Sequence, residues 1–257
     1  MLSLWLQKPT DVAPYTRLAS IYDHVMRHVN YERWARYLSD LFAKADFPVT
    51  SILDIACGTG SLLAHLHRLH FTVAGFDASF DMVSVARQKA KKQDRPLPLW
   101  QGNMGAFRVK QPFDACVCTY DSINYCLDLD GYLRVFNCVS ESLRPGGLFI
   151  FDVCTERNSR KYFRNHYENE ATREFLFVRQ SHYLHKERIQ VNEFLISFES
   201  DRRQTFRECH RQRIFRIKEI EGLIDSSVFE LIGLFDGFSR RPGGEKSNRV
   251  HFVLKRI

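Results

Sequence analysis

Two successive apolar runs end in groups that could bind a nucleotide. A glycine turn follows the first run, and an aspartate ends the second. Residues 51–55 are apolar around Asp54, and the small-residue turn that follows contains Gly58 and Gly60. Glycine lets the backbone turn tightly and lets a ligand approach where a Cβ would collide. The free amides of such a turn face the ligand at the start of the next helix. Asp77 ends the next apolar run, where its carboxylate can accept both hydroxyls of a ribose.

The same segment argues against a dinucleotide. The dinucleotide fingerprint needs a third glycine three positions after Gly60, where this chain has Leu63. A close backbone approach to a pyrophosphate therefore lacks support, which disfavours a nicotinamide or flavin oxidoreductase. An adenosyl group without phosphates fits the pattern better.

Further motifs follow in a familiar order. Residues 53–60 have Ala56 at a first glycine position, and they are followed by apolar or turn segments at 76–82, 101–104, 113–118 and 143–148. In this order, and over residues 14–154, the chain resembles the class I S-adenosylmethionine (SAM) dependent methyltransferases. The resemblance implies SAM as cofactor and a Rossmann-like, doubly wound sheet of seven mostly parallel strands.

The resemblance also implies roles for single residues. Asp77 would hold the ribose and Met82 would pack against the adenine, while Asn103, where the family usually has Asp, would meet the adenine amino group. Asp54 would order the glycine turn, although a helix-cap role alone would also explain it. The expected cofactor residues are Tyr15, Tyr22, Asp54, Ala56, Cys57, Gly58, Gly60, Asp77, Ala78, Met82, Gly102, Asn103, Met104, Thr119 and Tyr120.

The loop at residues 119–125 is the first candidate for the acceptor pocket, and by resemblance its start touches the methionine moiety. It lacks the Asn-Pro-Pro-Tyr or Asp-Pro-Pro-Tyr signature of many enzymes that methylate the amines of nucleic-acid bases or glutamine. Methylation of an exocyclic amine is therefore disfavoured. Methyl transfer from a sulfonium needs positioning above all, and a base only where the acceptor is protonated. The sequence accordingly identifies no catalytic residue.

Two further segments could line the acceptor pocket. Tyr15 and Tyr22 resemble a lid segment of small-molecule methyltransferases, but with Leu18 they also form an apolar stripe, so plain helix packing is an equal interpretation. Residues 156–215 contain histidines that titrate near neutral pH. Exposed strand histidines without function are the favoured interpretation of these, because isolated ionisable residues usually lie at the surface. They are His182, His185 and His210.

The elements that must position these residues follow from periodicity. Helical spacing of apolar residues predicts helices at 14–28 and 31–45. Strands are expected near 51–55, 71–76, 97–101, 113–118 and 147–153, with helices between them, and this alternation predicts a parallel sheet covered on both faces.

The pattern changes after Thr155. Aromatic and β-branched runs at residues 174–215, of which the last extends over Arg213–Ile217, predict two to four antiparallel strands joined by turns at 186–187 and 200–203. A helix near 217–225 and a closing hairpin with strands near 228–235 and 249–255 complete the core. We therefore expect a SAM-binding core at residues 1–155 and 216–257, with a helical lid at 1–48, and a substrate-facing antiparallel β cap at 156–215.

Composition excludes several classes. In a chain of 257 residues the net charge of +7 admits a nucleic-acid surface, but acidic residues interrupt the basic ones, so a solvated face is favoured. No apolar run approaches the ~20 residues of a membrane span, and the run at residues 2–6 ends too early for a signal peptide, which indicates a cytoplasmic protein. The seven cysteines lack zinc spacing, so no metal is expected, and Cys116 and Cys118 should share one buried strand face.

The sequence therefore predicts a methyltransferase that transfers the methyl group of SAM to an unidentified small molecule. The lid and the missing amine signature favour a small acceptor. A methyltransferase acting on RNA or protein, and a SAM-binding protein without activity, stay open as alternatives. The sequence predicts no oligomeric state.

Overall fold

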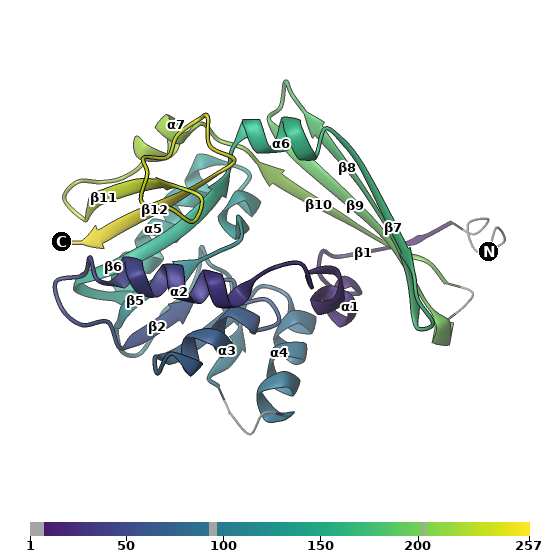
Figure 1. Ribbon diagram of the computed structural model, residues 1–257, viewed down its shortest axis with the longest axis horizontal. Helices are drawn as coiled ribbons and strands as arrows, with labels where there is room; N and C mark the ends of the chain where they lie inside the picture. The colour runs from purple at the N-terminus through teal and green to yellow at the C-terminus, as the bar shows by residue number, and fades with distance from the viewer. Residues whose placement is uncertain (1–7, 93–96, 202–203) are drawn as a thin grey trace.

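The computed structural model describes residues 8–92, 97–201 and 204–257, which form two sheets and the helices around them (Figure 1). The larger sheet has seven strands in the order β11-β12-β6-β5-β2-β3-β4. They are β2 (Ser51–Asp54), β3 (Thr72–Asp77), β4 (Leu99–Gln101), β5 (Phe113–Cys118), β6 (Leu143–Cys154), β11 (Phe229–Asp236) and β12 (Arg249–Arg256). The pairs from β4 to β6 are parallel, and β12 inserts antiparallel between β6 and β11. This confirms the Rossmann-like sheet of seven mostly parallel strands.

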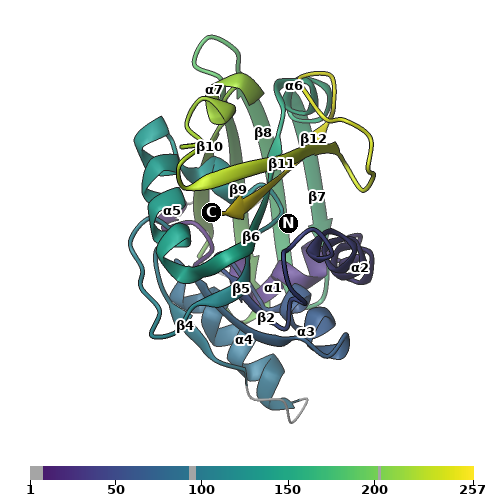
Figure 2. The same cartoon turned by 90° about the vertical axis from the view of Figure 1, so that its left-hand side faces the viewer.

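Helices cover both faces of this sheet, because successive side chains of a strand point to opposite sides. Ile52 of β2 packs with α2, α3 and α4, whereas Leu53 packs on the other face with α5 and α7. Figure 2 shows α2 and α3 on the side of the sheet opposite to α5. Cys116 and Cys118 share one buried face, as predicted. The helices are α1 (Leu18–Val25), α2 (Tyr31–Phe42), α3 (Ser61–Arg68), α4 (Phe80–Lys92), α5 (Leu129–Ser142), α6 (Glu156–Tyr162) and α7 (Ile217–Glu221), with short 3₁₀ turns η2 (Ser122–Tyr125) and η3 (Glu199–Asp201).

The smaller sheet, which we call the cap sheet, has five strands in the order β1-β10-β9-β8-β7. Four of them come from the insertion after β6, and the fifth, β1, precedes α1 and pairs parallel with β10. The bounds are β1 (Thr10–Val12), β7 (Asn165–Ala171), β8 (Phe175–Leu184), β9 (Ile189–Phe198) and β10 (Phe206–Arg213). Helix α1 packs Leu18, Ile21 and Val25 against phenylalanines of β8 and β9. The cap sheet and α1 thus enclose a small core of their own.

Two sequence predictions about these elements were wrong, and one was confirmed. Residues 102–112 contain no helix between β4 and β5; Asn103 Oδ1 accepts the N–H of Gly105 in a tight turn, and such local bonds compete with a helix. The run Arg213–Ile217 is not a strand, because β10 ends at Arg213 and Phe215 is buried in the core as a connection. The two to four strands predicted after residue 174 are confirmed as β8, β9 and β10, whereas β1 and the mostly polar β7 were not predicted.

Some expectations fall on residues outside the described ranges. These are the apolar run at 2–6 and, within the expected turn at 200–203, Arg202 and Arg203. The turn at 186–187 joins β8 to β9 as expected. Along the described residues, no helix is long and apolar enough to cross a membrane.

Candidate active site

A cavity of about 490 Å³ opens at the carboxyl ends of β2, β3 and β4, where ligands bind in open parallel sheets. Its wall contains eight of the predicted cofactor residues: Tyr15, Tyr22, Ala56, Gly58, Asp77, Ala78, Met82 and Met104. Four more, Asp54, Cys57, Thr119 and Tyr120, line a smaller cavity that shares Tyr22, Ala56 and Gly58 with it. We call the larger space the cofactor cavity.

Three predicted residues stand outside both walls. Gly60 closes the turn at the start of α3 with a left-handed φ of 75°, and a Cβ there would meet Ala86 at 3.3 Å. A Cβ on Gly102 would collide with Phe76 at 2.9 Å. The Asn103 side chain is occupied by its own turn. A direct contact of these three residues with a cofactor stays a prediction.

Asp77 and the glycine turn hold each other in place. Gly58 has φ of 53°, in the region that favours glycine, and its N–H donates to Asp77 Oδ2 at 2.9 Å while the Ser79 N–H donates to Oδ1 at 2.9 Å. Burial raises the pKa of Asp77. Each carboxylate oxygen keeps a second acceptor position, so the side chain can still take two hydroxyl donors from the cavity.

The composition of this wall tests whether SAM fits. Met82 and Ile55 supply apolar surface for a planar base, and Asp77 supplies the acceptor for ribose hydroxyls. Among the described residues that line the cavity there is no Lys, Arg or His. A phosphate would find no cation here, whereas a cationic sulfonium meets no like charge, so the residues fit SAM and disfavour a dinucleotide.

Asp54 lies below the glycine turn and is buried. Its Oδ1 accepts the N–H of Ala56 at 3.1 Å. Burial raises the pKa of this carboxyl to about 7, and the nearby charge of Asp77 acts in the same direction. Asp54 therefore shapes the turn from beneath and holds a proton over part of the neutral range.

Hydrogen bonds hold α1 and the residues before it over the cofactor cavity. The Tyr15 carbonyl accepts from Ser79 Oγ at 2.9 Å. Asp23, at the exposed side of α1, accepts from Thr59 Oγ1 at 2.6 Å and from Lys89 Nζ at 2.6 Å. These bonds join the lid to the glycine turn and to α4.

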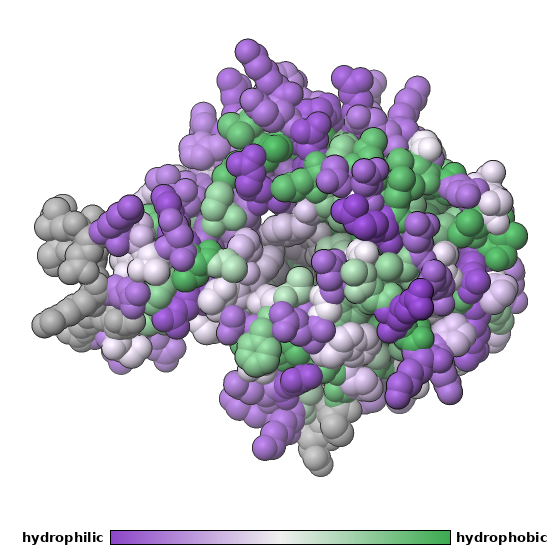
Figure 3. Space-filling model, turned by 180° about the vertical axis from the view of Figure 1, so that it is seen from behind, coloured by the Kyte–Doolittle hydropathy of each residue, from purple (hydrophilic) through white to green (hydrophobic). Residues whose placement is uncertain are grey.

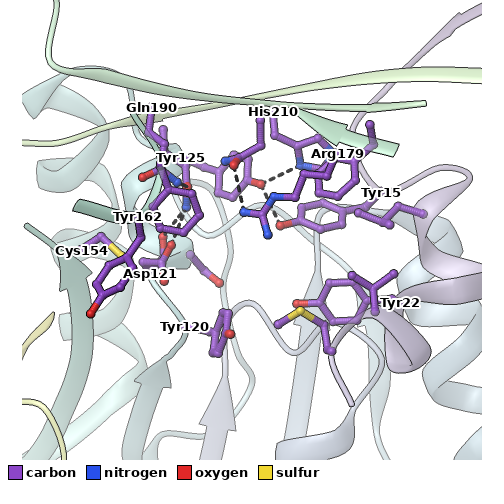
Figure 4. Close-up of a pocket in the computed structure, with 18 of the residues that line it drawn as sticks. Tyr15, Tyr22, Tyr120, Asp121, Tyr125, Cys154, Tyr162, Arg179, Gln190 and His210 are labelled. Atoms are coloured by element: carbon purple, nitrogen blue, oxygen red, sulfur yellow. Dashed lines mark hydrogen bonds between the residues drawn. The ribbon is translucent and has the colours of Figure 1, made fainter. Parts of the chain in front are cut away.

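A second cavity, of about 280 Å³, lies between the inner face of the cap sheet, α1, η2 and α6 (Figure 4). We call it the acceptor cavity. The surface seen from behind is hollowed near its centre (Figure 3). The two cavities share four wall residues, Tyr15, Tyr22, Ser122 and Tyr125. The two cavities therefore adjoin at these side chains.

A chain of buried hydrogen bonds ends at the shared wall. The hydroxyls of Tyr15 and Tyr125 are 2.7 Å apart, Tyr125 Oη lies 2.8 Å from His210 Nδ1, and His210 Nε2 lies 3.0 Å from Glu208 Oε2. A carboxylate only accepts, so Nε2 carries the proton and Nδ1 is free to accept from Tyr125. Tyr125 in turn accepts from Tyr15, which leaves an acceptor position on Tyr15.

Glu208 also holds the lid. Its carboxylate accepts the backbone N–H groups of Tyr15, Arg17 and Leu18 at 2.6–2.8 Å, and the side chain is fully buried. These are orphan donors at the start of α1, which a carboxylate satisfies well. One side chain of β10 therefore fixes both the lid helix and the imidazole of His210.

An ion-pair cluster shapes the loop after β5. Arg249 donates to Asp121 Oδ1 at 2.6 Å and to Asp152, and Asp152 accepts the N–H groups of Tyr120 and Asp121. Tyr120 and Asp121 have φ of 61° and 52°, a conformation that is strained for residues other than glycine. Asp152 and Arg249 therefore hold the loop that presents Tyr120 to the acceptor cavity.

Comparison with known proteins agrees with this geometry. A family model described as a methyltransferase domain matches residues 52–147. A putative methyltransferase of Bacillus subtilis, YqeM, is 28% identical over 94% of this chain and 97% of its own length. A SAM-dependent methyltransferase from Clostridium acetobutylicum has a similar structure, with a TM-score of 0.79 and 23% identity over 94% of this chain and 98% of that one.

This chain is a class I SAM-dependent methyltransferase. SAM is its cofactor. A sugar N,N-dimethyltransferase of Streptomyces venezuelae is 30% identical over 52% of this chain and 56% of its own length, and the structure of DesVI from the same species has a TM-score of 0.73 over 93% of this chain and 98% of that one, at 23% identity.

The methyltransferase contains site residues that the sequence prediction missed. His210 was expected as an exposed strand histidine and is instead buried at the acceptor cavity, with only 1% of its surface exposed. His182 and His185 are exposed as predicted, and His185 pairs with Glu156 at 2.9 Å. Tyr125 lies in the loop at 119–125 that was the first candidate for the acceptor pocket, whereas Arg179, Glu208 and Arg249 were not proposed as site residues. Glu208, His210 and Gln212 alternate along β10 with exposed residues, and this period of two is the signal of a polar face turned inward.

Proposed function

We propose that the methyltransferase transfers a methyl group to a small molecule bound in the acceptor cavity. The observation that carries this proposal is the wall shared by the two cavities, Tyr15, Tyr22, Ser122 and Tyr125. When bound, SAM supplies an electrophilic methyl group, and these side chains would align the nucleophile of the acceptor with it and exclude water. A volume of about 280 Å³ suits a metabolite. The relatives named as sugar N,N-dimethyltransferases support a small acceptor.

We also propose the route by which the acceptor loses its proton. The free acceptor position of Tyr15 takes the proton as the nucleophile is methylated, Tyr15 passes its own to Tyr125, and Tyr125 passes its own to His210 Nδ1. His210 becomes an imidazolium beside the carboxylate of Glu208, which stabilises it. Burial raises the pKa of both tyrosines, so each passes a proton on and does not stay ionised.

The proposed division of labour assigns one role to each sheet, with β1 of the lid segment joining the cap sheet. Residues 1–155 and 216–257 would form the SAM-binding core, with 1–48 as lid, and residues 156–215 the cap that covers the acceptor. All seven cysteines lie in the described part of the chain and are free thiols, which supports a reducing, cytoplasmic location. The acceptor cavity is enclosed by α1 and α6, a geometry that favours a metabolite over a nucleic acid.

Labelled methyl transfer tests the proposal. Native protein and isotopically labelled SAM are added to a cell extract, which is then separated into metabolite, RNA and protein pools. We expect label in the metabolite pool with the native protein and with the exposed control Asp130→Ala, and none with Asp77→Ala. Label in the RNA or protein pool that depends on Asp77 would contradict a small acceptor.

A further inference from the structure

One cation in the acceptor cavity has no counter-charge. Arg179 of β8 extends from the cap sheet into the cavity, toward the space bounded by Tyr15, Tyr125 and His210 (Figure 4). Its guanidinium lies between two phenylalanine rings, 5.1 Å from the centroid of Phe163 and 5.5 Å from that of Phe194.

The other charged groups of this cavity have partners within the structure. Arg249 is paired with Asp121 and Asp152, and His210 faces Glu208. His28 stands at the exposed rim. Arg179 has no acidic partner among the residues that the structure describes. Of the described arginine and acidic side chains that line the cavity, only Arg179 makes no ion pair, although Glu168 of β7 lies opposite it in the sheet register.

The hydrogen bonds of Arg179 are incomplete in a way that points to a ligand. One terminal nitrogen donates to Asn192 Oδ1 at 2.9 Å, and Ser181 Oγ donates to the same oxygen at 2.7 Å, which fixes the arginine in place. Its Nε is buried and has no acceptor. Leaving a buried donor unpaired is unfavourable by about 1–3 kcal/mol, more for a charged group. The guanidinium is thus held in position by Asn192, and its other terminal nitrogen, which is not buried, has no hydrogen-bond partner among the described residues.

We propose that the methyl acceptor is a compact anion whose carboxylate or phosphate binds Arg179. This inference rests on the proposed function. A guanidinium presents parallel donors that match two oxygens of a carboxylate or phosphate. An anion bound there leaves the rest of a small molecule directed at Tyr15 and Tyr125, where the nucleophile must lie. The flanking rings of Phe163 and Phe194 restrict the guanidinium to one plane and would orient the anion in that plane.

The charge of the labelled product tests this. Metabolites labelled by the native protein are passed over an anion-exchange column at neutral pH, with and without phosphatase treatment. We expect the label to be retained on the column. Loss of retention after phosphatase identifies a phosphate, and unchanged retention identifies a carboxylate. Label in the neutral or cationic fraction would overturn the anionic acceptor and leave the small-molecule proposal intact, whereas label in RNA or protein would overturn the proposed function itself.

Variants of Arg179 test whether this residue binds the anionic group of the acceptor. Arg179→Gln should raise the KM for the purified acceptor at least tenfold with little change in the Kd for SAM, and Arg179→Lys should recover part of the loss. The matched control is Arg211→Gln, on the outward face of β10, which should behave as the native protein. An unchanged KM in Arg179→Gln would overturn the assignment.

A binding measurement gives a readout that does not depend on turnover. Benzoate and inorganic phosphate serve as carboxylate and phosphate probes in thermal unfolding of the full chain. At least one should raise the Tm of the native protein and of Arg211→Gln, and neither should raise that of Arg179→Gln. Equal shifts in all three proteins would count against Arg179 as the anion site.

Discussion

The two cavities of this methyltransferase are built in different ways. The cofactor cavity is lined by short continuous segments, such as residues 13–16 and 77–82, that sit at strand ends and turns. The acceptor cavity is lined by single side chains from distant elements, including Tyr125 of η2, Arg179 of β8 and His210 of β10. Recognition of the cofactor thus depends on local backbone turns, and recognition of the acceptor on how two sheets are placed.

The electrostatics of the two cavities differ as well. Acidic residues line the cofactor cavity without a basic side chain, whereas the acceptor cavity contains two arginines and a buried Glu–His pair. Glu208 is the connection between them, because it bonds both the lid backbone over the cofactor and His210 beside the acceptor. If the cavities act as one unit, variants at this junction should have the largest effects.

We expect Glu208→Ala to reduce the free energy of unfolding by about 5 kcal/mol, since three backbone N–H groups lose a charged acceptor worth at least ~1.5 kcal/mol each. Urea unfolding measures this. The control Glu193→Ala removes a carboxylate from the opposite face of the neighbouring strand β9 and should stay within 1 kcal/mol of native, in line with about that limit for exposed pairs. A loss in Glu208→Ala as small as in the control would mean that the lid and the cap sheet are not coupled.

Asp54, a buried residue at the cofactor cavity, should make the free energy of unfolding depend on pH. Its pKa is raised from 3.8 to about 7 by burial, so the folded chain binds a proton that the unfolded chain releases between these values. The stabilisation is complete below about pH 4 and is lost as the pH rises through about 7, by about 4 kcal/mol. Asp54→Asn keeps an acceptor for the Ala56 N–H but cannot ionise, so its unfolding free energy should fall less across this range. Urea unfolding at several pH values measures this difference. An equal change of unfolding free energy with pH in both proteins would refute the raised pKa of Asp54.

Asp77→Ala should weaken SAM binding by about 3 kcal/mol, more than a hundredfold in Kd, because two charge-assisted hydrogen bonds are lost. Calorimetric titration of the native protein, the variant and the control Asp130→Ala measures it. The acceptor cavity should keep its response to the anionic probes, since no wall residue of that cavity is changed. An unchanged Kd would remove Asp77 from the cofactor site.

The difference between the two cavities explains how much of the fold and the site could be predicted from the sequence. The parallel strands of the sheet and the position of Asp77 follow from apolar runs that each end in a turn, and those signals lie within a few neighbouring residues. The total of seven strands was implied by the family resemblance. Residues 102–112 were mistaken for a helix because alternation was extended through a segment with its own turn at Asn103. Local patterns therefore predict the core and the cofactor side of the site, and they fail where a turn is determined by one side chain.

The side chains of the acceptor cavity are brought together by the register of the cap strands. A local sequence pattern does not contain this register. Glu208 lies opposite Phe194, and Phe194 lies opposite Arg179, so one row across β10, β9 and β8 brings these side chains together. A shift of one residue in either pairing would turn the row to solvent. His210 looked like an exposed residue because its burial comes from α1 and η2 and not from its own strand.

His210→Gln tests the proton route on the acceptor side. We expect kcat to fall by 10- to 100-fold, or about 1.4–2.7 kcal/mol, while the Kd for SAM stays native. His182→Gln, on the exposed face of β8, is the control. A variant with a native kcat would show that the tyrosines act without His210.

The smallest effect is expected at the outer edge of the lid. Lys89→Ala removes the 2.6 Å contact with Asp23, in which the two side chains are 29% and 44% exposed. Exposed pairs contribute about 0–1 kcal/mol and are screened by salt. The Kd for SAM should therefore rise by no more than about fivefold at low ionic strength, and the difference from native should vanish in 1 M salt. Thr59 would still bond Asp23 directly, so the lid stays in contact with the glycine turn. A loss of SAM affinity that persists in high salt would mean that Lys89 orders the lid by packing. The position of the lid would then depend on contacts at the cofactor side as strongly as it depends on Glu208.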